Sequence, residues 1–168
     1  AVTFAGGLAS MGKKPYVAIY STFMQRGFSQ LIHDISIQKL PVRFIIDRAG
    51  IVGEDGKTHN GLYDISMFTT IPNYTVIAPT TCDELIEALE ISKDFDDGPM
   101  VIRIPREISF SLENDEKFQI GKWKEIKKGE KILFIATGSM LKEILSIDEQ
   151  LKSKKINGTI VSAASIKP

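Results

Sequence analysis

The feature that most constrains the fold is a series of short, β-branched apolar runs separated by longer stretches with helical periodicity. The runs are YVAIY (16–20), VRFII (42–46), TVIA (75–78), MVIRI (100–104), KILFIA (131–136) and TIVSA (159–163). Such alternation is typical of a parallel sheet with helical crossovers. We therefore expect an α/β fold: a mostly parallel sheet with helices on both faces, followed by a partial second α/β unit.

The stretch after the first run predicts an amphipathic helix. Its apolar positions recur at i, i+3, i+4 and i+7, and they are Phe28, Leu31, Ile32 and Ile35. Ser21 or Thr22 can cap its start, because a short hydroxyl side chain accepts a hydrogen bond from a free N–H of the first turn. His33 lies beside the apolar stripe, and we interpret it as a surface or packing residue.

A second helix is predicted within residues 80–95. Thr81 is placed to cap it, and the acids that follow suit the positive end of the helix dipole. Its inward face is predicted to consist of Leu85, Ala88 and Leu89. Residues 1–10 and 141–155 are also expected to be helical.

The periodicity is lost after the run at 100–104, where charges are mixed and turn signals occur at Asn114 and Gly129. We interpret this part as an interdomain linker with a short strand or two. The expected division is a first domain over 1–108, a linker over 109–130 and an incomplete second domain over 131–168.

The composition limits the possible partners. The 168 residues include 21 basic and 21 acidic side chains, so no chain-wide field attracts a nucleic acid and any anion site must be local. No apolar run approaches the roughly 20 residues of a membrane span, and the start of the chain lacks the pattern of a signal peptide. The single cysteine, Cys82, excludes an internal disulfide and a thiolate zinc cluster. We expect a cytoplasmic protein that binds neither nucleic acid nor membrane, and no residue is predicted to bind a metal.

An arginine follows three of the predicted strands. Arg26 comes shortly after YVAIY, Arg48 follows VRFII, and Arg106 follows MVIRI. Ligands of open parallel sheets bind beyond the carboxyl ends of the strands, so these side chains are predicted to form an anion site. Phe23 shares a helix face with Arg26 and offers an aromatic ring beside it. Each arginine taken alone is better explained as a solvated charge, and the prediction depends on all three.

The stretch VGEDGKTHNG (52–61) follows the second of these strands. Gly53 and Gly56 permit positive φ, Asp55 supplies hydrogen-bond acceptors, and His59 can exchange a proton near neutral pH. The residue types of this stretch alone are compatible with a simple turn. The position of the stretch after a strand that ends in an arginine favours the wall of an active site.

Long runs of the sequence resemble the 1-deoxy-D-xylulose-5-phosphate synthase family. They are AVTFAGGLA, YVAIYSTFMQRGFSQLIHDISIQKLPVRFIIDRAGIVGEDGKTHNGLYDIS and GPMVIRIPR. The resemblance covers essentially the whole chain, and it implies the pyrimidine-binding domain of a three-domain enzyme with the start of its last domain. The corresponding domain of a transketolase or of a pyruvate dehydrogenase beta chain is an alternative. A non-catalytic dimerisation module is an alternative of a different class.

The resemblance implies a transferase that uses thiamine diphosphate and Mg²⁺, decarboxylates pyruvate and condenses the two-carbon unit with glyceraldehyde 3-phosphate. The resemblance also implies that the product would serve isoprenoid, thiamine and pyridoxal synthesis and that the enzyme would be a homodimer. Phe23 would stack on the aminopyrimidine ring, with Tyr20 and Arg26 beside it. The Mg²⁺ and diphosphate site is expected to lie outside this chain, and a fragment of this length is expected to be inactive alone.

The resemblance also implies a substrate site. Arg48 and Arg106 would hold the phosphate of the aldehyde, while Tyr20, Asp55 and His59 would line the reacting centre, with Asp55 and His59 as the catalytic candidates.

Two departures from the family pattern accompany this resemblance. A glutamate that bonds the pyrimidine precedes the segment matching Ala1–Phe4 in the family, and we expect it upstream of this chain. Glu107 stands where the family often has glycine, and it adds a negative charge beside Arg106.

Overall fold

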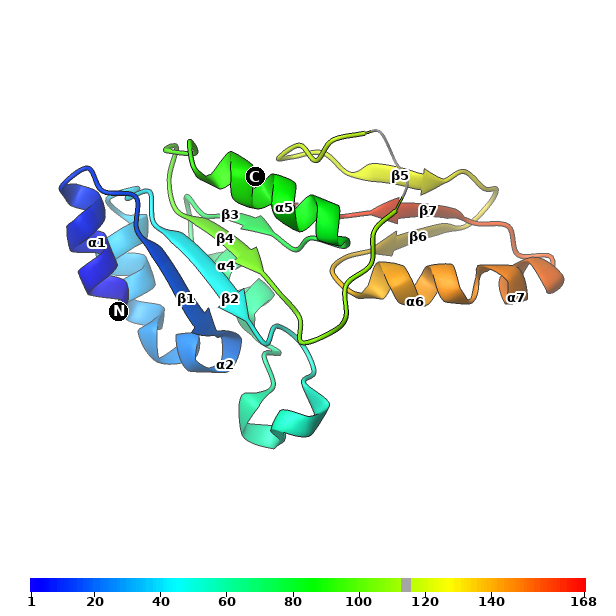
Figure 1. Ribbon diagram of the computed structural model, residues 1–168, viewed down its shortest axis with the longest axis horizontal. Coiled ribbons are helices and arrows are strands. Elements are labelled where there is room, and N and C mark those ends of the chain that lie inside the picture. Colours follow the sequence, from blue (N-terminus) through cyan, green and yellow to red (C-terminus); the bar gives the residue numbers. More distant parts are fainter. Residues whose placement is uncertain (113–115) are drawn as a thin grey trace.

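The computed structural model describes residues 1–112 and 116–168, which form two sheets of unequal size (Figure 1). The strands are β1 (Tyr16–Tyr20), β2 (Arg43–Asp47), β3 (Thr75–Ile77), β4 (Met100–Arg103), β5 (Lys124–Lys127), β6 (Leu133–Ala136), β7 (Thr159–Ser162) and β8 (Ser165–Lys167). The α-helices are α1 (Val2–Ser10), α2 (Ser21–Met24), α3 (Phe28–Gln30), α4 (Asp64–Thr70), α5 (Cys82–Ser92), α6 (Met140–Ser146) and α7 (Asp148–Ser153). Short segments of other helix types are η1 (Gln25–Gly27), η2 (Leu31–Ser36), η3 (Gly53–Asp55) and η4 (Lys57–His59). The turn predicted at Asn114 lies outside the described residues.

The larger sheet has the order β1-β2-β4-β3-β8, and its first four strands are parallel. All six runs predicted to be strands are strands in the structure. The registers place Tyr20 opposite Asp47 and Ile46 opposite Arg103, so three strands end at nearly the same level. This alignment matters for function because it brings the residues after each strand to one edge of the sheet.

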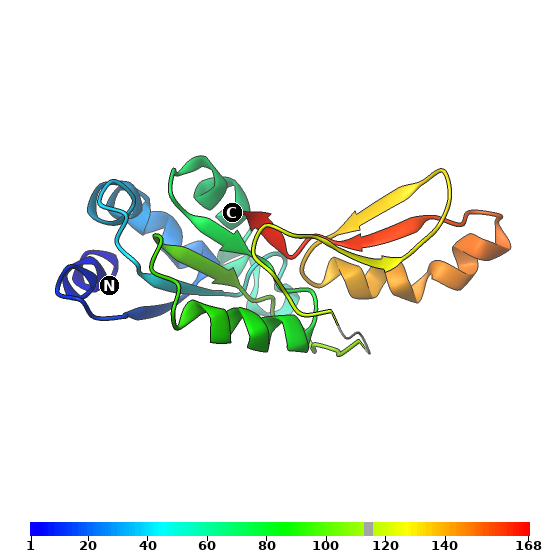
Figure 2. The same ribbon diagram turned by 90° about the horizontal axis from the view of Figure 1, so that it is seen from above.

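Helices cover both faces of the larger sheet, as the α/β prediction required (Figure 2). On one face, α1, η2 and α4 share a core cluster with the strands, and Phe44 of β2 contacts the rings of Phe68 and Tyr74. On the other face, α5 packs against Ile77, Met100 and Ile102. Alternate residues of each strand therefore enter different cores, which explains why the strands are apolar on both sides.

The first predicted amphipathic helix is interrupted. It runs as α2, η1, α3 and the π-helical η2, and its buried residues include Leu31 and Ile35 but not the exposed Phe28. The predicted caps are wrong: the Thr22 hydroxyl donates to the carbonyl oxygen of Thr58 at 3.1 Å, and the buried Ser21 hydroxyl has no partner among the described residues. Tertiary contact with the loop at Thr58 thus replaces local capping at this helix start.

The second predicted helix is α5, and its cap is confirmed. The Thr81 hydroxyl accepts a hydrogen bond from the backbone N–H of Glu84 at 3.2 Å. Ala88 is fully buried, and Leu85 and Leu89 pack against the same core. The helix expected over 141–155 is divided into α6 and α7, which lie along the smaller sheet (Figure 1).

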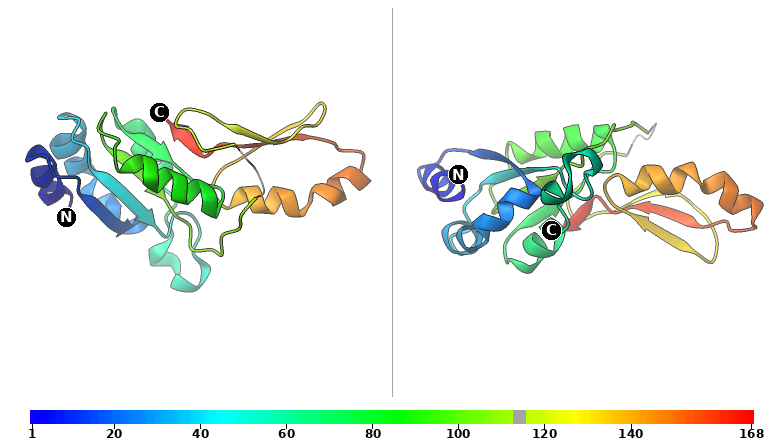
Figure 3. Two further views of the ribbon diagram at one scale, coloured as in Figure 1. Left: turned by 45° about the horizontal axis from the view of Figure 1, so that its top comes forward. Right: turned by 90° about the horizontal axis from the view of Figure 1, so that it is seen from below.

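The smaller sheet, β5-β7-β6, extends away from the larger one, and the chain then returns (Figure 3). After β7, the three residues of β8 pair antiparallel with β3, and Lys167 Nζ donates to the carbonyl oxygens of Thr69 and Ile71 at 3.1 and 2.5 Å. The linker predicted over 109–130 contains β5, which belongs to the smaller sheet. In the described part of the chain, no helix is both long and apolar enough to cross a membrane.

Candidate functional site

The candidate site lies beyond the carboxyl ends of β1, β2 and β4, where residues 51–60 project from the sheet (Figure 3). The base of this loop is closed by two backbone hydrogen bonds, from Gly50 N to Gly61 O at 2.9 Å and from Gly61 N to Gly50 O at 2.8 Å. Asn60 Oδ1 accepts from the N–H of Val52 at 3.0 Å. The loop is therefore anchored at its base while its tip reaches over the strand ends.

Gly61 has no room for a side chain. A Cβ at this position would lie 2.5 Å from Ser21 Cβ and closer still to the carbonyl oxygen of Arg48. The glycine thus lets the loop base pack directly on the start of α2 and on the turn after β2. Gly53 and Gly56, with φ of 53° and 79°, have the positive values predicted from the sequence.

Three rings meet at the exit of β1. Tyr20 and Phe23 are stacked, with centroids 5.4 Å apart and planes 9° from parallel. The His59 ring lies edge-on to both, 5.4 Å from Phe23 and 6.2 Å from Tyr20. Its Nδ1 is 3.0 Å from the hydroxyl of Thr58. The loop thus places His59 against the aromatic pair, although His59 and Phe23 are 36 residues apart in the sequence.

Arg48 is held from three sides. Its Nε donates to Asp55 Oδ2 at 3.1 Å, its Nη1 donates to Asp47 Oδ2 at 2.7 Å, and its guanidinium lies 4.5 Å from the centroid of the Tyr20 ring. The hydrogen bond to Asp55, followed by the charge of Asp47, raises the pKa of the guanidinium. Its backbone is left-handed, with φ of 54°, a conformation that costs an L-residue about 1–2 kcal/mol. Local strain at a strand exit, maintained by this many contacts, is common at functional sites.

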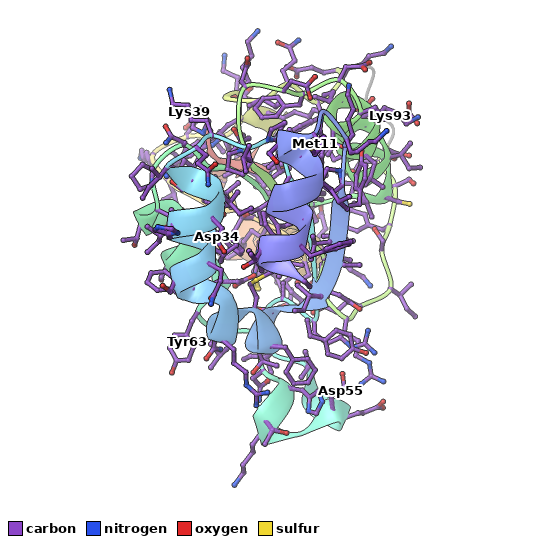
Figure 4. The ribbon with its side chains drawn as sticks, turned by 90° about the vertical axis from the view of Figure 1, so that its left-hand side faces the viewer. Met11, Asp34, Lys39, Asp55, Tyr63 and Lys93 are labelled. Carbon is purple, nitrogen blue, oxygen red and sulfur yellow. The ribbon has the colours of Figure 1, made fainter. Side chains whose placement is uncertain are left out.

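Asp55 joins the second arginine to the first. Arg106 Nη1 lies 3.0 Å from Asp55 Oδ1, and Arg106 Nη2 donates to Glu54 Oε2 at 3.3 Å. One carboxylate therefore bridges guanidinium groups that follow neighbouring strands, β2 and β4. Figure 4 shows Asp55 on the projecting loop, below the helices that cover the sheet.

The third arginine is apart from this pair. Arg26 is exposed, and its side chain makes no hydrogen bond or ion pair with any other residue that the structure describes. It lines an open hollow of about 300 Å³ together with Phe23, Ile19, Met24 and the first residues of α1. The contacts thus unite Tyr20, Phe23, Arg48, Asp55, His59 and Arg106, while Arg26 shares only the ring of Phe23 with them.

Sequence reasoning missed a buried ion pair beneath the site. Arg103, the last residue of β4, donates from Nε to Asp64 Oδ2 at 2.9 Å and from Nη2 to Asp64 Oδ1 at 3.3 Å. The side chain of Asp64 is 2% exposed and that of Arg103 11%. An arginine at the end of a strand was visible in the sequence, but only the fold reveals that it faces the start of α4.

The other candidates lie outside the site. His33 is on the surface of η2, where its Nδ1 is 2.9 Å from Asp34 Oδ1, and Cys82 is a free, partly buried thiol at the start of α5. Figure 4 shows Asp34 between η2 and α1, away from the loop. The described residues contain no group of three or more His, Cys, Asp or Glu side chains placed to hold a metal.

Two known proteins with similar sequences carry the same name. The chain is 67% identical to a 1-deoxy-D-xylulose-5-phosphate synthase of Fusobacterium nucleatum over 99% of its own length. It is 44% identical to the enzyme of the same name from Clostridium perfringens over its whole length. In both cases it spans 28% of the length of the relative. The resemblance predicted from the sequence is thereby confirmed.

Structural comparison agrees. A solved structure described as a split-gene transketolase, inactive beta4 tetramer, has a TM-score of 0.84 and 26% sequence identity, and the match covers 96% of this chain and 52% of that one. Residues 121–168 match the family described as transketolase, C-terminal domain, and residues 1–109 match the family described as transketolase, pyrimidine binding domain. The chain therefore belongs to the transketolase pyrimidine-binding domain family and continues into the first part of a transketolase C-terminal domain.

Proposed function

We propose that this chain is the central part of a 1-deoxy-D-xylulose-5-phosphate synthase. The full-length enzyme would decarboxylate pyruvate and join the two-carbon unit to glyceraldehyde 3-phosphate. One observation carries the proposal: an exposed aromatic platform, a histidine and two arginines converge where three parallel strands end. Relatives with this printed name at 44% and 67% identity support it.

The two arginines are proposed to bind the phosphate of the aldehyde. Arg48 and Arg106 present planar, permanently charged forks, and such forks match the oxygens of a phosphate group. Both follow neighbouring strands and already converge on one carboxylate, which supports a common anion position. Tyr20, whose ring underlies the guanidinium of Arg48, would orient that fork.

His59 and Asp55 are proposed to act at the reacting oxygens. His59 lies at the edge of the Tyr20 and Phe23 rings, and an imidazole can hold or transfer a proton near neutral pH. Asp55 approaches from the same loop and can accept a hydrogen bond from a substrate hydroxyl. The closed loop base would keep both groups over the strand ends and limit the access of water.

The residues fit thiamine diphosphate as the cofactor. Phe23 is 41% exposed and stands beside the hollow lined by Ile19, Met24 and Arg26, which offers an apolar wall and a cation to a flat, polar-edged ring. When bound, the cofactor supplies the carbanion chemistry of decarboxylation. Phe23, Tyr20 and Arg26 would hold its pyrimidine end, and Mg²⁺ with the diphosphate would be held by parts of the enzyme outside this chain.

We propose that residues 1–108 act as the pyrimidine-binding domain, 109–130 as a linker and 131–168 as the start of the C-terminal domain. The enzyme is proposed to be a cytoplasmic homodimer, and the 168-residue chain to be inactive without the rest of it. The description of a similar transketolase as a tetramer supports an oligomer.

The test is carbon dioxide release by a protein of the relatives' full length that carries this chain. Release from pyruvate should depend on glyceraldehyde 3-phosphate, with 1-deoxy-D-xylulose 5-phosphate as the product. If carbon dioxide release did not depend on the aldehyde, or if the enzyme used a ketose phosphate donor instead of pyruvate, the chain would belong to a different thiamine enzyme.

The same assay tests the role of His59. His59→Ala should lower turnover by about 10²–10⁴-fold while leaving the affinity for thiamine diphosphate nearly unchanged, because the imidazole acts on the reacting oxygens. His33→Ala is the matched control, since that imidazole is exposed on η2 and should leave turnover at the wild-type level. Equal losses in both variants would remove His59 from the proposed site.

A further inference from the structure

The proposed phosphate site already contains an anion, which is the side chain of Asp55. Each of its two carboxylate oxygens faces a different arginine: Oδ2 accepts from Arg48 Nε and Oδ1 lies 3.0 Å from Arg106 Nη1. The side chain of Asp55 is 21% exposed, less than that of either arginine. Asp55 is thus held between the two forks, which is where a bound phosphate would have to lie.

The charges of the two forks are more than compensated without a ligand, by three carboxylates. Asp47 contacts Arg48 from the side of the strand, and Glu54 contacts Arg106 from the exposed side. Three carboxylates therefore surround two guanidinium groups, and only Asp55 touches both. An incoming anion that needs donors from both arginines competes with Asp55 at both guanidinium groups, whereas Asp47 and Glu54 each contact only one of them.

We infer that Asp55 is an internal competitor for the anion site, so that phosphate binds only when the Asp55 carboxylate leaves the arginine pair. This inference rests on the proposed function of Arg48 and Arg106 as the phosphate site. Asp55 thereby sets the affinity of the site for anions, and its release delivers a free carboxylate to the region of His59 at the moment when the substrate arrives.

The chain allows this release without opening the whole loop. The hydrogen bonds between Gly50 and Gly61 fix the base, and the contact of Asn60 with Val52 lies next to it. Asp55 belongs to the single turn η3 at the tip, where its own contacts are ion pairs between part-exposed groups. Such pairs exchange readily because each contributes little net free energy.

Displacement has a quantitative signature. The measured affinity of any anion equals its intrinsic affinity multiplied by the fraction of molecules in which the arginine pair is open. Removing the internal competitor therefore raises the affinity for a dianion and for a monoanion by the same factor. A carboxylate that stayed beside the ligand would act by repulsion, and its removal would favour the dianion more strongly.

The experiment compares Asp55→Asn with the wild type in the full-length protein. Binding of inorganic phosphate is followed by ³¹P NMR line broadening and binding of acetate by its methyl signal. The affinities for phosphate and for acetate should both rise, each by about threefold to fivefold, as expected for the loss of a part-exposed bridging carboxylate. Glu54→Gln, which removes a contact with Arg106 alone, is the matched control and should change either affinity by less than about twofold.

Two outcomes overturn the inference. Weaker phosphate binding in Asp55→Asn would mean that Asp55 supports the arginines, and a much larger gain for phosphate than for acetate would mean repulsion without displacement. Asp55→Ser, measured in the same way, guards against an effect peculiar to the asparagine amide. Failure of the wild type and both variants to bind phosphate would instead overturn the assignment of the arginine pair as the phosphate site.

Discussion

Two arginine–carboxylate clusters lie at the same edge of the larger sheet, and they differ in burial and in sharing. In the first, Arg103 gives two hydrogen bonds to Asp64, and both side chains are almost completely buried. In the second, Arg48 and Arg106 share Asp55, and all three side chains are part-exposed. The same chemical groups thus form a fixed support in one place and an exchangeable contact in the other.

The difference follows from the cost of removing charge from water. A buried pair must keep its partner, because an unpaired buried charge is very unfavourable. A part-exposed pair loses little when it opens, because water replaces the partner. The buried cluster joins the end of β4 to the start of α4, and α4 begins three residues after Gly61 at the base of the loop that carries the exchangeable cluster. Position at a strand exit therefore does not by itself make an arginine a ligand-binding residue.

The largest effect is expected when the buried cluster is broken. Arg103→Met leaves the Asp64 carboxylate buried without its partner, which should lower the free energy of unfolding by about 3–5 kcal/mol. Urea denaturation of the full-length protein, followed by circular dichroism, measures this loss.

The double variant Arg103→Met/Asp64→Leu is the control. Because it removes both charges, most of the stability should return. If Arg103→Met lowered the free energy of unfolding by less than about 1 kcal/mol, Arg103 would resemble the part-exposed arginines, and the two clusters would not differ in the proposed way.

The next effect concerns Gly61, which lies at the base of the loop that carries Asp55. Gly61→Ala forces a Cβ against Ser21 and the carbonyl of Arg48, so the loop base must shift, with an expected loss of about 1–3 kcal/mol. Gly7→Ala is the matched control, because that glycine lies in α1 with nothing within 4 Å of an added Cβ. It should gain about 0.5–1 kcal/mol from the lower entropy of the unfolded chain. Thermal denaturation should therefore show a lower stability for Gly61→Ala and a higher stability for Gly7→Ala.

The sequence was informative about the elements and about part of the site. Apolar runs indicated every strand of the parallel core, and the positions of Arg48 and Arg106 after two of these strands indicated that they would meet, because neighbouring parallel strands end at one edge. A sequence pattern predicts structure well where one physical requirement, the burial of a strand, constrains several consecutive residues at once.

What the sequence did not reveal depends on contacts distant along the chain. The three residues of β8 have no pattern of their own, and they are a strand only because β3 offers an edge about 90 positions earlier. Ser21 was a reasonable cap, but α2 begins one residue earlier than expected, with Tyr20 at the N-cap position, so Ser21 is the first helical residue and packs against Gly61. The pairing of Arg103 with Asp64 likewise requires the fold, since a charged residue at the end of a strand is ordinarily solvated.

The smallest effect on stability is expected at Asp55, although it has the central role in anion binding. Asp55→Asn should change the free energy of unfolding by less than about 1 kcal/mol, because its pairs are part-exposed and water can replace them. The change should be independent of pH near neutrality: the contact with Asp55 raises the pKa of Arg48, so the contribution of this contact is lost only when the pH rises beyond the ordinary range of an arginine. Urea denaturation at low and high salt measures both the size and the screening of this contribution. A loss as large as that of Arg103→Met would make Asp55 a second fixed support, and the arginine pair could then not open for a ligand.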